Sequence, residues 1–331
     1  MALNKRPKIA IIGSGNIGGI LAYHATSRKL GDIVLYDNVE GRAEGKSIDI
    51  SVAAREDEFD LRITGTSNYE DIADSDIVVI TAGASRRYGM SRGDLVAINS
   101  ENMFGIAQGI RKYAPSACVI VVSNPLDAMV TLCQRCTGFP HQRVMGMAGV
   151  LDSARFATFI AEELGVSVRD VNATVLGSHG DCMVPIVRFA NVNGIPVMEL
   201  LRQKYRGDEQ RVQETMDALV LRTQKAGGEI IRLLKDKSAY YSPASSILTM
   251  IEAIIQNRKR LITATAYLTG QFGVSGYYVG VPCILGASGV ERIVEFEMTP
   301  HEKAMFDKSV DDIQQLVAQL PEIPPEFAPK P

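Results

Sequence analysis

Short apolar runs alternate with longer amphipathic stretches over the first 148 residues, and this rhythm predicts parallel strands joined by helices. Six runs have the length and composition of buried strands, at residues 9–12, 33–36, 61–66, 77–82, 119–122 and 144–147. The amphipathic stretches predict helices at residues 16–30, 41–55, 95–113 and 126–136. Six strands with intervening helices and no internal repeat predict a doubly wound α/β fold, whose ligands bind beyond the carboxyl ends of the strands.

The pattern changes after residue 148. Longer helical stretches follow, with hairpin-like strands expected at residues 183–189, 261–267 and 277–285 and a further strand at 172–176. We therefore predict two domains, a nucleotide-binding domain at 1–148 and a second α+β domain with antiparallel ribbons at 149–331. The proline-rich end, PEIPPEFAPKP, is expected to be loosely held.

Three glycines with the spacing G-x-G-x-x-G stand at the first strand-to-helix junction. Gly13 permits a tight turn, Gly15 lets a pyrophosphate approach the backbone, and Gly18 lets the helix pack on the strand. The phosphates then meet unpaired N–H groups at the positive end of a helix dipole. A glycine turn can also serve packing alone. The strand before it, the helix after it and an acidic residue at position 37 favour a Rossmann-type dinucleotide site.

Asp37 ends the second predicted strand. A carboxylate there can accept hydrogen bonds from a ribose 2′-OH and would repel a 2′-phosphate. Because the next residues, Asn38 and Val39, offer no cation for that phosphate, NAD is favoured as the cofactor. A solvated aspartate at a strand end is the structural alternative.

The composition narrows the function classes. Of the 331 residues 46% are apolar and 22% charged, with a net charge of −3 and no basic tail, so nothing favours nucleic-acid binding. No apolar run approaches the roughly 20 residues of a membrane span. Five scattered cysteines and the lack of a leader-like segment suggest a cytoplasmic protein. Cys133 and Cys136 form a C-x-x-C inside a predicted helix without a second ligand pair, so we expect no metal site.

A basic loop follows the fourth predicted strand. Arg86, Arg87 and Arg92 fall within seven residues, with no acidic residue before Asp94. Clustered guanidinium groups repel one another, so such a loop is explained if an anion binds between them. The glycines around it would let the loop close over a substrate. A solvated basic loop remains the alternative.

Two further motifs have both a structural and a functional interpretation. Asn124 can cap the helix that begins near Pro125, or it can present a polar group at the open edge of the sheet. Asp152 and Arg155 are spaced i, i+3, so they can form an ion pair on one helix face or serve a site together.

His179 differs from the other histidines of the chain. His24 lies in a predicted helix, His141 in a turn and His301 at a helix start, whereas His179 lies between Gly180 and the Gly177–Ser178 pair after a predicted strand. The glycines leave its imidazole uncrowded. Because histidine exchanges protons readily near neutral pH, His179 is the candidate acid–base residue.

Taken together, these motifs resemble the lactate/malate dehydrogenase family, specifically its lactate dehydrogenase-like malate dehydrogenases. They occur in the family's order and separations over about residues 8–320. The carrying segments are GSGNIG (13–18), YD (36–37), TAGASRRYGMSR (81–92), SNP (123–125), LDSAR (151–155) and GSHGD (177–181).

The resemblance implies a role for each matching residue. His179 would donate or accept the proton, Asp152 would orient it, Arg155 would bind the substrate's C1 carboxylate, and Arg92 would polarise the reacting carbonyl. Cofactor contacts would come from Gly13, Ser14, Gly15, Asn16, Ile17, Gly18, Asp37, Asn99, Val122 and Asn124, with Asn124 also touching the substrate. The resemblance further implies a cis peptide before Pro125 and a homotetramer, with a dimer as the alternative.

Specificity is expected to depend on Arg86. In the family, arginine at this loop position pairs with a second carboxylate, whereas lactate dehydrogenases have glutamine or a longer loop. The expected partner is therefore a small dicarboxylic 2-hydroxy or 2-oxo acid, malate or oxaloacetate. Lactate or a broad range of 2-hydroxy acids is one alternative, and a catalytically silent NAD-binding redox sensor is another. Tyr88, Ser178 and Gly93 depart from the common pattern, and Tyr88 could alter loop closure.

Overall fold

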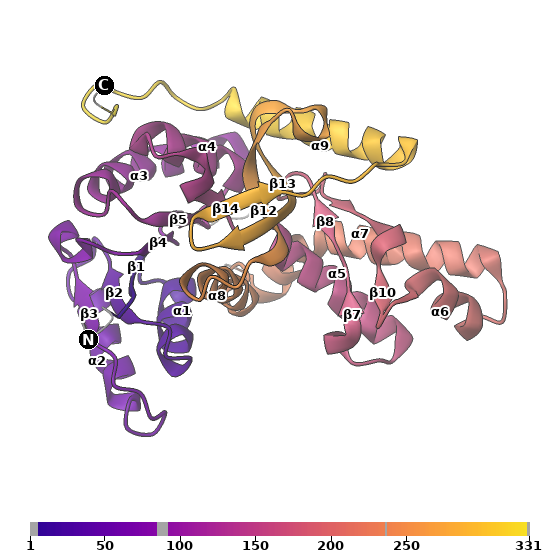
Figure 1. Ribbon diagram of the computed structural model, residues 1–331, viewed down its shortest axis with the longest axis horizontal. Helices are drawn as coiled ribbons and strands as arrows, with labels where there is room; N and C mark the ends of the chain where they lie inside the picture. Colours follow the sequence, from indigo (N-terminus) through magenta and orange to yellow (C-terminus); the bar gives the residue numbers. More distant parts are fainter. Residues whose placement is uncertain (1–5, 85–91, 236, 330–331) are drawn as a thin grey trace.

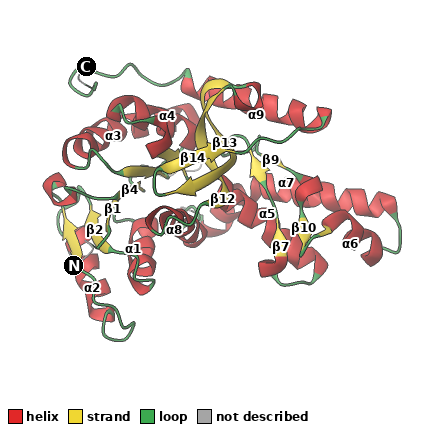
Figure 2. Ribbon diagram, viewed as in Figure 1, coloured by secondary structure: helices red, strands yellow, loops and turns green. Residues whose placement is uncertain are grey.

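The computed structural model describes residues 6–84, 92–235 and 237–329. Its first half forms a parallel sheet with the order β3-β2-β1-β4-β5-β6 (Figures 1 and 2). The strands are β1 (Lys8–Ile12), β2 (Asp32–Tyr36), β3 (Ile63–Thr66), β4 (Ile77–Ile80), β5 (Cys118–Val121) and β6 (Val144–Gly146). All neighbouring pairs among them are parallel, which confirms the predicted doubly wound (Rossmann) sheet.

Helices cover both faces of this sheet. They are α1 (Asn16–Ser27), α2 (Arg42–Ala53), α3 (Arg92–Tyr113) and α4 (Leu126–Thr137). Side chains alternate along each strand, so Ile9 and Ile11 of β1 belong to the core on the α1 side, whereas Ala10 and Ile12 belong to the core beneath α3 and α4. Every residue of β4 is fully buried, as expected for a strand covered on both sides.

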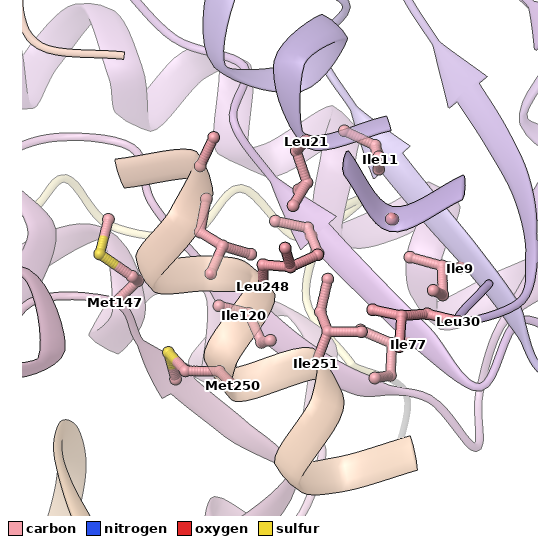
Figure 3. Close-up of a cluster of buried hydrophobic side chains, with 14 of the residues drawn as sticks. Ile9, Ile11, Leu21, Leu30, Ile77, Ile120, Met147, Leu248, Met250 and Ile251 are labelled. Carbon is pink, nitrogen blue, oxygen red and sulfur yellow. The ribbon is translucent and has the colours of Figure 1, made fainter. Parts of the chain in front are cut away.

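Helix α8 (Tyr241–Ile255) comes from the second half of the chain but packs on the sheet of the first half. In Figure 3 its residues Leu248 and Ile251 lie beside Leu21 of α1 and against Ile9 and Ile77 of the strands, and all five side chains belong to one buried cluster. Burial of large aliphatic side chains contributes about 1.5–3 kcal/mol each. The two halves of the chain therefore share a core.

The antiparallel ribbon of the second half continues the same sheet. Strands β12 (Arg260–Thr269), β13 (Ser275–Gly286) and β14 (Gly289–Ile293) are antiparallel to one another, and β12 pairs with β6 through Thr265 and Gly146. The whole sheet has nine strands in the described residues. The remaining elements are α5 (Gly149–Leu164), β7 (Val171–Asn172), β8 (Val175–Leu176), β9 (Val184–Pro185), β10 (Asn191–Val192), β11 (Ile195–Pro196), α6 (Val197–Lys204), α7 (Glu209–Leu234) and α9 (Pro300–Val317).

Two predicted strands of the second half differ from the structure. Residues 172–176 form two short strands, because β7 pairs with β10 whereas β8 pairs with β9. The strand expected at 183–189 is limited to Val184–Pro185 and is followed by a 3₁₀ turn at Val187–Phe189. Proline has no N–H to continue a ladder, so the run ends early.

The proline-rich end is also more firmly attached than expected. The ring of Phe327 stacks on Phe104 of α3 with centroids 5.5 Å apart, and Arg111 donates to the Phe327 carbonyl at 3.1 Å. Figure 1 shows this segment returning from α9 across α4 and α3. Among the described helices, none combines the length and apolarity needed to cross a membrane.

Candidate active site

The glycine turn, residues 13–18, joins β1 to α1. Gly13 has φ +104°, and a Cβ added there would lie 2.6 Å from the backbone nitrogen of Ala82, while one added at Gly18 would lie 1.9 Å from the Gly13 carbonyl oxygen. Nothing lies within 4 Å of a Cβ added at Gly15. Packing therefore requires glycine at 13 and 18. At Gly15 the space is open, and no side chain caps α1, so its first N–H groups can receive a phosphate.

Asp37 closes the same turn. Its Oδ2 atom accepts hydrogen bonds from the backbone and the hydroxyl of Ser14 at 2.8 and 2.7 Å, and its Oδ1 atom accepts one from the backbone of Val39 at 3.1 Å. Burial alone would raise the pKa of Asp37, but these bonds and the charge of Arg42 hold the pKa below its ordinary value. The carboxylate is therefore ionised where a ribose hydroxyl would need an acceptor.

A cation lies near Asp37, although Asn38 and Val39, the residues that follow it in the sequence, carry no positive charge. Arg42, in the first turn of α2, approaches Asp37 Oδ1 to 3.4 Å and is half exposed. Lys46, one turn further, donates to the carbonyl of Gly15 at 2.9 Å. Asp37 thus lies between the glycine turn and Arg42, whereas Lys46 contacts the turn directly.

His179, Asp152 and Arg155 form one hydrogen-bonded group. Asp152 Oδ2 lies 2.9 Å from His179 Nδ1, and Arg155 donates to Asp152 Oδ1 at 3.1 Å. Burial lowers the pKa of His179, but the Asp152 carboxylate outweighs it, so the pKa is above its ordinary value. The sequence offered an ion pair and a functional site as alternatives for Asp152. The ion pair is present, and the same carboxylate also binds the imidazole.

Arg155 retains capacity for a further partner. Its side chain is 11% exposed, and its Nε atom is buried without a hydrogen-bond partner among the described residues. An unpaired buried donor is costly unless a ligand satisfies it. A carboxylate is the group that an arginine fork binds best.

The histidine loop, residues 177–181, is held by its backbone. The N–H of Gly177 donates to the Gly280 carbonyl of β13 at 2.8 Å, and the N–H of Ser178 donates to the Ser309 hydroxyl of α9 at 2.8 Å. Gly177 has φ +86°, and a Cβ there would lie 2.2 Å from Ser309 Oγ. The approach of β13 and α9 fixes the loop and explains why glycine precedes the histidine by two positions.

The third N–H of the loop has a charged acceptor. His179 donates its backbone N–H to Asp127 Oδ2 at 3.0 Å. Sequence reasoning missed Gly280, Ser309 and Asp127. Only Asp127 carried a signal, since it is the sole acid in the otherwise apolar start of the helix predicted at 126–136.

Val122 and Asn124 follow β5, and Asn99 of α3 lies beside them. Asn99 is buried, accepts a hydrogen bond from Ala84 N–H at 2.7 Å and donates to the carbonyls of Ala84 and Asn124 at 3.2 and 2.6 Å. Val122 continues β5 by donating to the Ile80 carbonyl. Asn99 therefore connects the start of the basic loop to Asn124.

The capping alternative for Asn124 is wrong. Pro125 takes the N-cap position of α4, no side chain caps that helix, and the side chain of Asn124 is exposed. The peptide bond between the two residues is cis, as the family resemblance implied.

The basic loop is only partly placed. Arg86 lies outside the described residues, and Arg92 is described only as the first residue of α3. The proposed contacts of both guanidinium groups stay predictions. Over the described ranges no group of histidine, cysteine and acidic residues could hold a metal ion.

The candidate site residues that the structure describes lie at one edge of the sheet. Gly13 follows β1, Asp37 follows β2, and Val122 and Asn124 follow β5. Because Asp127 lies in the first turn of the helix after β5 and accepts the backbone N–H of His179, the histidine lies at this edge too. This is the edge where a doubly wound sheet binds its ligand.

Residues 7–146 match the family model described as lactate/malate dehydrogenase, NAD binding domain. Residues 149–322 match the model described as lactate/malate dehydrogenase, alpha/beta C-terminal domain. The chain belongs to the lactate/malate dehydrogenase family.

Relatives of this chain include both malate dehydrogenases and a lactate dehydrogenase. The chain is 61% identical to a malate dehydrogenase of Geotalea daltonii over 315 residues, which are 95% of this chain and 99% of that protein. It is 39% identical to the solved malate dehydrogenase of Cryptosporidium parvum, with a TM-score of 0.91 and coverage of 95% and 99%. It is also 39% identical to the lactate dehydrogenase of that organism, solved with lactic acid and NAD, with a TM-score of 0.92 and coverage of 97% and 100%. The fold alone therefore does not separate the two activities.

Proposed function

We propose that this protein is a malate dehydrogenase that interconverts malate and oxaloacetate reversibly, with His179 as the proton donor and acceptor. As a member of its family it is an oxidoreductase that acts on CH–OH groups and uses NAD. The buried group in which Asp152 binds both His179 and Arg155 supports the dehydrogenase chemistry, and the 61% identity to a malate dehydrogenase over 95% of the chain supports malate as the substrate.

The proton chemistry follows from that group. Asp152 holds Nδ1 of the imidazole, which leaves Nε2 to face a substrate oxygen. The protonated imidazole gives its proton to the C2 oxygen of oxaloacetate as a hydride reaches C2, and the neutral imidazole takes the proton from malate in reverse. When bound, NADH supplies the hydride for reduction and NAD⁺ accepts it in the reverse direction. Asp152 stabilises the imidazolium in either direction.

The arginines would place and activate the substrate. We assign the C1 carboxylate to Arg155, whose Nε lacks a partner among the described residues. Arg92, carried by the basic loop, would stabilise the developing charge on the C2 oxygen. Arg86 would pair with the second carboxylate and so favour oxaloacetate over pyruvate.

The cofactor would lie along the glycine turn, residues 13–18. Its pyrophosphate would meet the backbone at Ser14, Gly15, Asn16 and Ile17, and its ribose would bind Asp37. Asn99, Val122 and Asn124 would face the nicotinamide end, with Asn124 also near the substrate. The open space at Gly15 and the uncapped start of α1 fit this use.

We also propose the domain boundaries, the cellular compartment and the oligomeric state of the protein. Residues 1–148 would be the NAD-binding domain and residues 149–331 the substrate-binding and catalytic domain. The protein would be a cytoplasmic homotetramer, with a dimer as the alternative. Light scattering of the purified protein measures the assembly directly.

The test of function is NADH oxidation measured with a panel of 2-oxo acids. We expect kcat/KM for oxaloacetate to exceed that for pyruvate by at least about 100-fold, the scale on which a site that pairs a polar group discriminates. Equal or faster turnover of pyruvate would favour the lactate dehydrogenase alternative. NADH binding without turnover of any 2-oxo acid would favour the redox-sensor alternative.

A further inference from the structure

A second carboxylate lies behind the candidate catalytic histidine. Asp127, in the first turn of α4, is 1% exposed, and its Oδ2 atom accepts the His179 N–H at 3.0 Å. Its Oδ1 atom is buried and has no hydrogen-bond partner among the described residues. The proton-transfer chemistry assigned to His179 and Asp152 makes no use of this group.

Asp127 connects the two halves of the chain at the site. It lies two residues after Pro125, on the helix that follows β5, while His179 follows β8. The N–H groups of the two residues before His179 are bound by the Gly280 carbonyl and by the Ser309 hydroxyl. Asp127 is therefore the contact through which the sheet edge assigned to the cofactor fixes the histidine backbone.

The charge of Asp127 goes beyond what this hydrogen bond needs. Any carbonyl or hydroxyl oxygen could accept the N–H, as the Gly280 carbonyl and the Ser309 hydroxyl do for the two preceding residues. A buried carboxylate with an unpaired oxygen is costly. The unfavourable burial of this charge is explained if the charge stabilises the protonated imidazole of His179.

The charged groups around Asp127 agree with such an effect. The charge of His179 lowers the pKa of Asp127, whereas the charges of Asp312 of α9 and Asp152 of α5 raise it. Burial raises the pKa of Asp127 to about 6, so the group is mostly ionised at neutral pH. The protonated imidazole of His179 is favoured most by Asp152, opposed by the charge of Arg155, and favoured further by the charge of Asp127.

We propose that Asp127 is a positioning residue that acts through His179: it fixes the histidine backbone, and its charge adds to that of Asp152 in stabilising the imidazolium. The kinetic part of this inference depends on the proposed function, but its effect on the imidazole does not. The two can therefore be tested apart.

The first test is titration of the histidine ring protons by NMR in the full-length protein, comparing wild type with Asp127→Asn. Asparagine keeps an oxygen acceptor for the His179 N–H and removes the charge. The chain has four histidines, and His179→Asn identifies the signal. We expect the pKa of His179 to fall by about 0.5–1 unit, less than the 1–3 units of a direct ion pair, because the imidazole itself binds Asp152. An unchanged or higher pKa overturns the proposal, whatever reaction the protein catalyses.

The second test is the pH dependence of kcat/KM in both directions. With Asp127→Asn, the pH at which oxaloacetate reduction is lost and the pH at which malate oxidation begins should both move lower, which gives up to 10-fold less reduction on the alkaline side. Asp311→Asn, the same change on the exposed face of α9, should leave both midpoints in place because solvent screens it. Unmoved midpoints in folded Asp127→Asn protein overturn the electrostatic part. This holds even if the variant is slower than wild type, because a lower rate with the same pH midpoints shows a loss of positioning alone.

Discussion

Asp152 binds His179 with one carboxylate oxygen, at 2.9 Å from Nδ1, and uses its other oxygen to accept a hydrogen bond from Arg155. The side chains of Asp152 and Arg155 are only 3% and 11% exposed. One buried carboxylate therefore sets the distance between the imidazole and the guanidinium. A 2-oxo acid held by the guanidinium would present its reacting oxygen at a fixed place relative to the imidazole.

The first prediction concerns Asp152→Asn. Removing the carboxylate takes away the charge that raises the pKa of His179, so that pKa should fall. Reduction of oxaloacetate requires the protonated imidazole, and its loss with rising pH should therefore occur at lower pH than in wild type. We expect kcat to drop by about 100-fold or more. Steady-state rates between pH 5 and 9 measure both effects, and a midpoint at or above the wild-type pH would contradict the role of Asp152.

The second prediction concerns Arg155→Lys. Lysine keeps the charge but cannot present two parallel N–H groups to a carboxylate. Losing one bond to a charged group lowers kcat/KM for oxaloacetate by about 10- to 100-fold, through a higher KM. Fluorescence titration should show unchanged NADH affinity. The matched control is Arg222→Lys, since that arginine pairs with Glu162 and Glu229 on the surface, and it should behave as wild type. An unaltered KM in Arg155→Lys would remove the substrate carboxylate from Arg155.

The sheet could be predicted well from the sequence because its strands are buried on both faces. A continuous apolar run such as residues 77–80 is typical of a strand in that position, and the structure places β4 there. The flanking glycines singled out His179 in the sequence, and Gly177 has a positive φ, but the role of His179 in proton transfer stays a prediction. Burial on both faces makes such strands predictable from local sequence, whereas the histidine loop also depends on its contacts with β13 and α9.

Contacts between distant residues could not be predicted in this way. Asp127 and His179 are 52 positions apart, and only the folded chain brings them together. The run at 172–176 changes strand partner in its middle, which no local pattern records. The partner of a side chain is decided by topology.

A third prediction uses two glycines of the turn as a matched pair. Gly18→Ala places a Cβ 1.9 Å from the Gly13 carbonyl oxygen, and overpacking of this kind costs about 1–3 kcal/mol. Gly15→Ala meets nothing within 4 Å, so the protein should unfold at the wild-type temperature. The methyl group would nevertheless occupy the space assigned to the pyrophosphate. Thermal unfolding and NADH titration separate the two effects, and equal loss of stability in both variants would argue against this description of the turn.

A fourth prediction concerns the choice of dinucleotide. Asp37→Ser removes the carboxylate that repels a 2′-phosphate and leaves Arg42 without its acidic partner. We expect the ratio of the NADPH Kd to the NADH Kd to fall by about 100-fold, since placing like charges together costs several kcal/mol. Fluorescence titration with both reduced cofactors gives the ratio. Adding Arg42→Ala should reverse most of the gain in NADPH affinity, and a gain that persisted would exclude Arg42 as the phosphate partner.

The last prediction addresses Arg86, which lies outside the described residues and is assigned from the family motif. Arg86→Gln removes the cation proposed to pair with the second carboxylate of oxaloacetate, while His179, Asp152 and Arg155 keep their geometry. Because a site that loses a charged partner loses discrimination at that group, kcat/KM for oxaloacetate should drop by about 100-fold or more, and pyruvate should gain relative to it. The matched control is the same substitution at the neighbouring arginine, Arg87→Gln, which should keep the wild-type preference for oxaloacetate over pyruvate. If Arg86→Gln and Arg87→Gln leave selectivity equally unchanged, the preference for a dicarboxylic acid must come from residues elsewhere in the site.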